Sequence, residues 1–142
     1  MRILGIDFGE SRIGISMSDP LGMIAQGCDT IEWKGAELIP YDKILEKVKI
    51  NNVSKIVVGL PKNMNGSMGP RADRTLVFIE GLKKIILEEK LEVDIIKWDE
   101  RLSTKAAYRT MHEIGLKAKK KKGIVDKLAS VHILQNYLDS IA

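Results

Sequence analysis

Cysteine, histidine and aromatic residues are scarce in this chain, and each scarcity excludes a class of site. The single cysteine, Cys28, cannot form an internal disulfide, so a reduced, cytoplasmic setting is the economical interpretation. His112 and His132 lie on different predicted helices and lack the spacing of metal ligands. Aromatic residues make up 5% of the chain, too few and too scattered for a platform on which nucleic-acid bases stack.

Long apolar runs are also missing. No stretch approaches the ~20 apolar residues that a membrane-spanning helix needs, so we expect no membrane segment. The apolar start of the chain meets an acid at Asp7, too early for a secretory signal.

The composition that is present suits one globular domain with an uneven charge. With 142 residues, 44% hydrophobic and 30% charged, the chain is expected to fold as a single domain over residues 1–142. Residues 1–100 carry 14 Lys and Arg against 16 Asp and Glu, whereas residues 101–142 carry 9 against 3. Much of this excess lies in a basic segment, residues 117–122. The segment either attracts phosphates or is a solvated loop, and charge alone leaves both open.

Hydrophobic periodicity predicts alternating strands and helices. Strands are expected at residues 2–8, 12–18, 23–33, 55–60 and 93–98. Helices are expected at residues 40–49, 71–90, 104–115 and 124–140. An early meander followed by alternating helices and strands implies an α/β fold, in which helices pack on a mixed sheet. Sites in such sheets form beyond the carboxyl ends of the strands.

Asp7 is the first candidate for chemistry, because it follows an apolar strand. A carboxylate on a buried strand is unfavourable unless its charge is paired, and Mg²⁺ or Mn²⁺ would pair with it well. Gly9 would let a phosphate or a water approach the backbone closely. The alternative is a hairpin aspartate satisfied by neighbouring backbone N–H groups. This residue alone supports both interpretations equally.

Two further acidic positions could converge with Asp7. Asp99 and Glu100 follow the last predicted strand, and Asp126 is expected in the first turn of the final helix. Taken alone, each position is better explained in an ordinary way, as a solvated acid pair in the first case and as a helix-dipole interaction in the second. The small Ala129 and Ser130, one turn after Asp126, would leave room beside Asp126 for an ion or a substrate backbone. Together the acids could hold one or two cations, which activate a water and stabilise the leaving oxygen of a phosphodiester.

A long polar loop at residues 61–70 contains glycines, asparagines and prolines. Its backbone N–H groups and side-chain amides could hold a phosphate. The alternative, a flexible surface connection, is favoured by the loop sequence alone.

Four sequence blocks, spread nearly from end to end, carry a family resemblance. They are Gly5-Ile6-Asp7-Phe8-Gly9 with Arg12-Ile13-Gly14; Val57-Val58-Gly59-Leu60-Pro61 with Asn65-Gly66-Ser67 and Gly69-Pro70-Arg71-Ala72; Asp99-Glu100-Arg101-Leu102-Ser103-Thr104; and Asp126-Lys127-Leu128-Ala129 with Ile133-Leu134-Gln135 and Tyr137-Leu138. In order and spacing these blocks resemble the YqgF/RuvX family. Two positions depart from the family's usual pattern, Asn65 where Asp is common and Ser130 where Ala is common.

The resemblance implies an RNase H-like fold related to the RuvC resolvases, with a mixed five-stranded sheet and helices on both faces. It also implies a cytoplasmic nuclease that requires Mg²⁺ or Mn²⁺ and matures the 5′ end of pre-16S ribosomal RNA. By position, Asp7, Glu100 and Asp126 match the family's catalytic and metal-binding acids, with Asp99 as a further metal ligand. Candidates for contact with nucleic acid come from the same blocks and the basic segment: Arg12, Asn65, Ser67, Arg71, Arg101, Lys119, Lys120, Lys121 and Lys122.

Other functions stay open at this point. A Holliday junction resolvase would use the same site and favours a symmetric dimer, so the expected substrate is precursor rRNA or branched DNA and the expected assembly a monomer or a homodimer. The segment from Gly5 to Gly14 also resembles the first phosphate loop of sugar kinases and actin-like ATPases, which close two such domains around a nucleotide. A non-catalytic RNA-binding module is disfavoured, because it gains nothing from acids that face phosphates.

Overall fold

The computed structural model describes residues 1–34, 38–100 and 122–142, with side chains from Leu128 onward in the last range. The described elements are, in chain order, β1 (Arg2–Phe8), β2 (Arg12–Ser18), β3 (Ala25–Glu32), α1 (Tyr41–Ile50), β4 (Val53–Leu60), α2 (Pro70–Glu88), β5 (Asp94–Asp99) and α4 (Lys122–Ile141). The helix predicted at residues 104–115 lies outside the described residues.

The described strands form a five-stranded mixed sheet in the order β3-β2-β1-β4-β5. β1 pairs with β2 and β2 with β3 in antiparallel fashion, which is the predicted meander. β1 pairs with β4 and β4 with β5 in parallel fashion. Because parallel neighbours end at the same edge of a sheet, the carboxyl ends of β1, β4 and β5 lie side by side.

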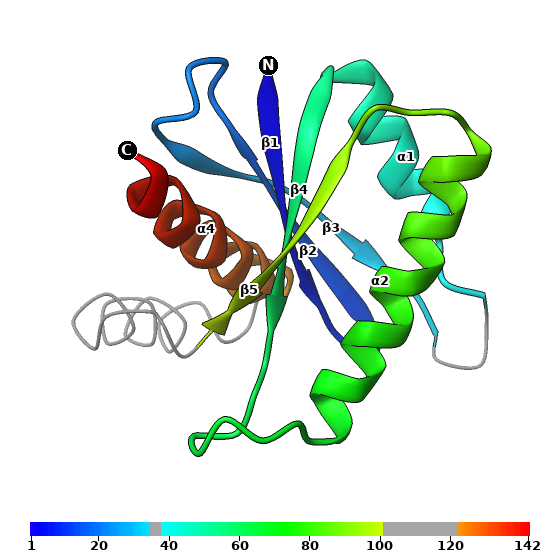
Figure 1. The fold of residues 1–142 in the computed structure, drawn as a ribbon, viewed down its shortest axis with the longest axis vertical. Coiled ribbons are helices and arrows are strands. Elements are labelled where there is room, and N and C mark those ends of the chain that lie inside the picture. Colours follow the sequence, from blue (N-terminus) through cyan, green and yellow to red (C-terminus); the bar gives the residue numbers. More distant parts are fainter. Residues whose placement is uncertain (35–37, 101–121) are drawn as a thin grey trace.

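Helices cover both faces of this sheet, as predicted. α1 and α2 lie on one face and α4 on the other (Figure 1). Side chains alternate along β1, so that Leu4 and Ile6 pack in one core with Phe78 of α2. Ile3 packs in a second core with Leu134 and Tyr137 of α4. None of the described helices is long and apolar enough to cross a bilayer.

Several element boundaries differ from the predicted ones. β4 begins at Val53 and α2 at Pro70, and β5 continues through Asp99, which we expected just past the strand. The described part of the last helix begins at Lys122, because the helix continues through Gly123 rather than starting after it. Asp126 is therefore beyond the first turn, where the helix dipole acts most strongly, and its expected place in that turn is wrong.

Candidate active site at the carboxyl edge of the sheet

The predicted acids gather where the parallel strands end. The strand register pairs Ile6 of β1 with Val58 of β4, and Leu60 of β4 with Asp99 of β5. Asp7 directly follows Ile6, and Glu100 directly follows Asp99. The structure thus places these acids at one edge of the sheet, the edge where α/β proteins hold their ligands. Their roles as metal ligands stay predictions.

Glu100 extends over the end of β4, where Gly59 leaves space for its carboxyl group. A Cβ atom at Gly59 would stand 3.1 Å from Glu100 Oε1 and 2.5 Å from Cδ1 of Ile133 in α4. The carboxyl group therefore lies on the face of the sheet that α4 covers. The sequence marks Gly59 only as a glycine near the end of an apolar strand, a signal that predicts no role for it.

Asp7 belongs to the same face. Side chains alternate along a strand, so Asp7 shares a side of β1 with Ile3 and Gly5, both of which adjoin α4. Along β5, Trp98 packs toward α4 and Ile95 toward α1 and α2, which puts Asp99 on the side of Ile95. Glu100, the next residue, therefore lies on the same side of the sheet as Asp7.

The pKa of Glu100 depends on its burial and on the nearby Asp7. Its pKa is raised to about 7, first because burial disfavours the charged form and second because Asp7 is close. Asp99 raises the pKa of Glu100 further, and the Arg71 guanidinium lowers it. The edge therefore holds a partly buried acid group that stays partly protonated near neutral pH unless a positive charge joins it.

The amino-terminal part of α4 approaches the same edge. Ser130 donates its hydroxyl hydrogen to the Gly5 carbonyl of β1 at 2.9 Å. Five residues later, Gln135 Oε1 accepts the backbone N–H of Ala25 at 2.9 Å, at the start of β3. Because α4 passes from the middle of β1 to the start of β3, its earlier residues lie nearer the acids (Figure 1). Asp126 precedes Ser130 by one turn, about 6 Å along the helix axis.

Two small residues near this site have close neighbours of their own. Ser130 is fully buried, and its hydroxyl is hydrogen-bonded to β1, whereas the room expected beside Asp126 concerns a side chain outside the described residues and stays a prediction. At Gly9, a Cβ atom would lie 2.6 Å from the Arg12 carbonyl oxygen. The group that approaches Gly9 closely is thus the turn's own carbonyl, which accepts the Gly9 N–H at 2.8 Å.

The loop between β4 and α2 is held by its own hydrogen bonds rather than being a loose connection. Asn65 Oδ1 accepts the backbone N–H of Ser67 at 3.0 Å and its hydroxyl at 2.6 Å. Asn63 Nδ2 donates to Ser67 Oγ at 3.0 Å, and Gly66 adopts a positive φ of 87°. Asn65 and Ser67 therefore shape the loop, and their contact with nucleic acid stays a prediction.

Only some of the basic residues predicted to contact nucleic acid belong to the part of the chain that the structure describes. Arg12 pairs with Glu32 at 3.7 Å, and Arg71 lies in the first turn of α2 within electrostatic range of Glu100. Arg101 and Lys119 to Lys121 lie outside the described residues, and the side chain of Lys122 does too.

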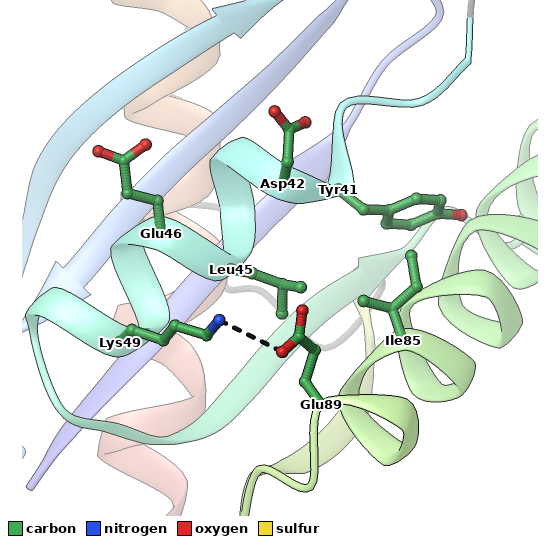
Figure 2. A pocket seen from close by; sticks show the side chains of 7 residues that line it. All are labelled: Tyr41, Asp42, Leu45, Glu46, Lys49, Ile85 and Glu89. Carbon is green, nitrogen blue, oxygen red and sulfur yellow. Dashed lines mark hydrogen bonds and ion pairs between the residues drawn. The ribbon is translucent and has the colours of Figure 1, made fainter.

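A pocket lies between α1 and α2, away from Asp7 and Glu100. The Lys49 ammonium and the Glu89 carboxylate form an ion pair at this pocket, with 3.5 Å between nitrogen and oxygen; Figure 2 marks the pair with a dashed line. Its lining consists of Tyr41, Asp42, Leu45, Glu46, Lys49, Ile85 and Glu89. Ile85 and Glu89 lie at the carboxyl end of α2, whereas Arg71 lies at its amino end. The pocket therefore does not belong to the candidate active site.

Comparisons with known sequences give one consistent family. A family model described as "RuvX: Holliday junction resolvase" matches residues 1–140. A relative from Acetivibrio thermocellus is 51% identical over 140 residues, covering 99% of this chain and 96% of the relative. A relative from Listeria monocytogenes serotype 4b is 45% identical over 141 residues and covers 99% of both chains. Both relatives carry the name "Putative pre-16S rRNA nuclease".

Comparisons with solved structures concern the fold. The structure of RuvC from T. thermophilus in complex with a Holliday junction substrate superposes with a TM-score of 0.58 at 15% identity, covering 99% of this chain and 95% of that chain. The fowlpox virus resolvase in complex with Holliday junction DNA gives 0.57 at 13% identity, with 99% of both chains covered. These likenesses confirm the predicted RNase H-like fold.

Proposed function

The chain belongs to the RuvX family, and from this membership we propose that it is a nuclease that uses Mg²⁺ or Mn²⁺ to cut precursor 16S rRNA during maturation of its 5′ end. Relatives at 45 to 52% identity carry names of that activity. We propose further that residues 1–142 act as one domain, in the cytoplasm.

The observation that carries the proposal is the pairing of Asp7 and Glu100 on one face of the sheet. The two acids come from β1 and from the residue after β5, and the Glu100 carboxyl lies over Gly59 of the strand between them. Two neighbouring carboxylates are unfavourable without a positive charge, and the pKa of Glu100 is raised first by burial and then by the nearby Asp7. Carboxylate oxygens are the ligands that Mg²⁺ and Mn²⁺ prefer.

Asp7 and Glu100 would hold the metal, Asp126 would complete the set, and Asp99, which alternation places on the other side of β5, would act on Glu100 through its charge. No group of three Asp, Glu, His or Cys side chains within the described residues could hold a metal by itself, so the proposal requires Asp126. When bound, the metal supplies an activated water and stabilises the leaving oxygen of the phosphodiester. Glu100 must give up its proton to serve as a ligand. Arg71 favours this loss, because its positive charge lowers the pKa of Glu100.

Basic and polar residues around the same edge would hold the phosphate backbone of the substrate. Arg71 is well placed for this, because it lies in the first turn of α2 and within electrostatic range of Glu100. The other proposed contacts are Arg12, Asn65 and Ser67, together with Arg101 and Lys119 to Lys122.

The test compares Asp7→Asn with wild type on a precursor 16S rRNA fragment in Mn²⁺. Asn keeps the size of the side chain but removes the charge, so we expect cleavage to fall by at least about a hundredfold. Asp94→Asn is a matched control, because Asp94 is exposed at the opposite end of β5. Undiminished cleavage by Asp7→Asn would refute the assignment of the site.

A second candidate function is the resolution of Holliday junctions, and the family's description favours it. The same acids would cut DNA, because a metal site addresses the phosphate rather than the sugar. Resolution requires two cuts and hence two active sites, which favours a symmetric dimer. A protein that sediments as a monomer at working concentration and leaves four-way junctions intact would exclude this candidate.

A further inference from the structure

The turn between β1 and β2 connects two of the proposed functional residues. Asp7 lies just before this turn and Arg12 just after it. Within the turn, the Gly9 N–H donates to the Arg12 carbonyl at 2.8 Å. Any displacement of the turn would therefore move both residues relative to Glu100, which belongs to a different strand end.

Trp33, which follows β3, holds this turn at two points. Its backbone N–H donates to the Ser11 carbonyl at 2.9 Å. Its indole Nε1–H donates to the Gly9 carbonyl at 3.1 Å. β3 pairs only with β2 in the described sheet, so the indole bond reaches past the neighbouring strand to the end of β1.

The Trp33 ring also contacts the residue after Asp7. Its centroid lies 5.6 Å from that of Phe8, which in turn stacks on Phe78 at 4.3 Å. Phe78 stacks on Tyr41 of α1 at 5.6 Å, which completes an aromatic row from the turn to the helical layer. The Phe8 ring is thus held between the rings of Trp33 and Phe78, while the Gly9 carbonyl is held by the indole N–H.

We propose that Trp33 is a positioning residue for Asp7, which it acts on through the Gly9 carbonyl and the Phe8 ring. The inference rests on the proposed function of Asp7. Metal ligands must be held within about 0.5 Å of their working geometry by their supporting contacts. Loss of such a contact typically costs roughly ten- to a hundredfold in metal affinity or activity.

The experiment compares Trp33→Phe with Tyr41→Phe. Each variant keeps an aromatic ring in the same row but removes one hydrogen-bond donor. Trp33→Phe removes the indole N–H together with the pyrrole ring, and Tyr41→Phe removes the hydroxyl that donates to the Phe78 carbonyl at 3.1 Å in the helical layer. Two quantities are measured for each: kcat and KM for cleavage of the precursor RNA, and the Mn²⁺ concentration that gives half of the thermal stabilisation of the fold.

We expect Trp33→Phe to lower kcat by about tenfold or more with little change in KM, and to raise the half-saturating Mn²⁺ concentration several-fold. Tyr41→Phe should leave both unchanged, even where it lowers the melting temperature equally. Equal kcat values and equal Mn²⁺ midpoints for the two variants would overturn the role of Trp33. A wild-type protein that cleaves no RNA would refute the proposed function instead, and the Mn²⁺ midpoints would still decide the role of Trp33.

Discussion

Replacing Glu100 by Gln should stabilise the metal-free protein at high pH. The folded protein holds the Glu100 proton more tightly than the unfolded chain does, because burial and Asp7 raise the pKa of Glu100 to about 7 from 4.5. Stability therefore falls as pH rises from about 4.5 to about 7, and it levels off above that range. Gln keeps the size and shape of the side chain but carries no charge at any pH.

The magnitude follows from the pKa difference. One pKa unit corresponds to about 1.4 kcal/mol, so the full difference is worth about 3 kcal/mol above pH 7. Glu100 is partly exposed, and solvent screening reduces the expected effect to about 2 kcal/mol. At pH 4 the glutamate is protonated in both states, and the gain from the substitution should vanish.

Urea unfolding in EDTA, at pH 4.5 and at pH 8.5, measures this effect. We expect the advantage of Glu100→Gln over wild type, as free energy of unfolding, to be about 2 kcal/mol larger at pH 8.5 than at pH 4.5. An advantage of the same size at both pH values would show that neither burial nor Asp7 raises the pKa of Glu100, and it would contradict the electrostatics described for the site.

Three further predictions concern the surroundings of this acid. Mn²⁺ should raise the melting temperature of wild type and of Asp94→Asn equally, and that of Glu100→Gln much less, as thermal denaturation will show. Gly59→Ala should lower cleavage more than tenfold while costing about 1–3 kcal/mol in urea unfolding, because the new Cβ would stand 3.1 Å from Glu100 Oε1 and 2.5 Å from Ile133 Cδ1. Preserved activity would contradict this placement of Glu100. Ser130→Ala should cost about 1–3 kcal/mol, because the buried Gly5 carbonyl loses its 2.9 Å hydrogen bond. The hydroxyl oxygens of Ser130 and the buried Ser16 also lie 2.9 Å apart. Ser16→Ala combined with Ser130→Ala should therefore cost less than the sum of the two single changes, and strict additivity would argue against this shared network.

The strand pattern was the part of this protein that sequence could predict. The apolar runs before Asp7 and Asp99 predict two strands. Helices between the strands predict that neighbouring strands run parallel, which places the acids at their ends along one edge of the sheet. The family resemblance supplied the RNase H-like fold, which the structural comparisons confirm.

Contacts between residues far apart in the sequence could not be predicted. The role of Gly59 depends on the reach of Glu100 across a neighbouring strand, and that of Ser130 on its bond to Gly5, 125 residues earlier. Local rules also placed the start of the last helix too late, because glycine disfavours helices on its own but is tolerated within one at Gly123. Trp33 gave no sequence signal, since its partner is a backbone carbonyl 24 residues away.

The central claim is that Asp7 and Glu100 form a metal-dependent site that cuts precursor rRNA. The most direct test is the cleavage rate of wild type, Asp7→Asn and Asp94→Asn on a precursor 16S rRNA fragment and on a four-way DNA junction, side by side in Mn²⁺. We predict that wild type and Asp94→Asn cut the RNA at equal rates, faster than the junction, and that Asp7→Asn cuts neither substrate. RNA cleavage by Asp7→Asn at the wild-type rate would contradict the account.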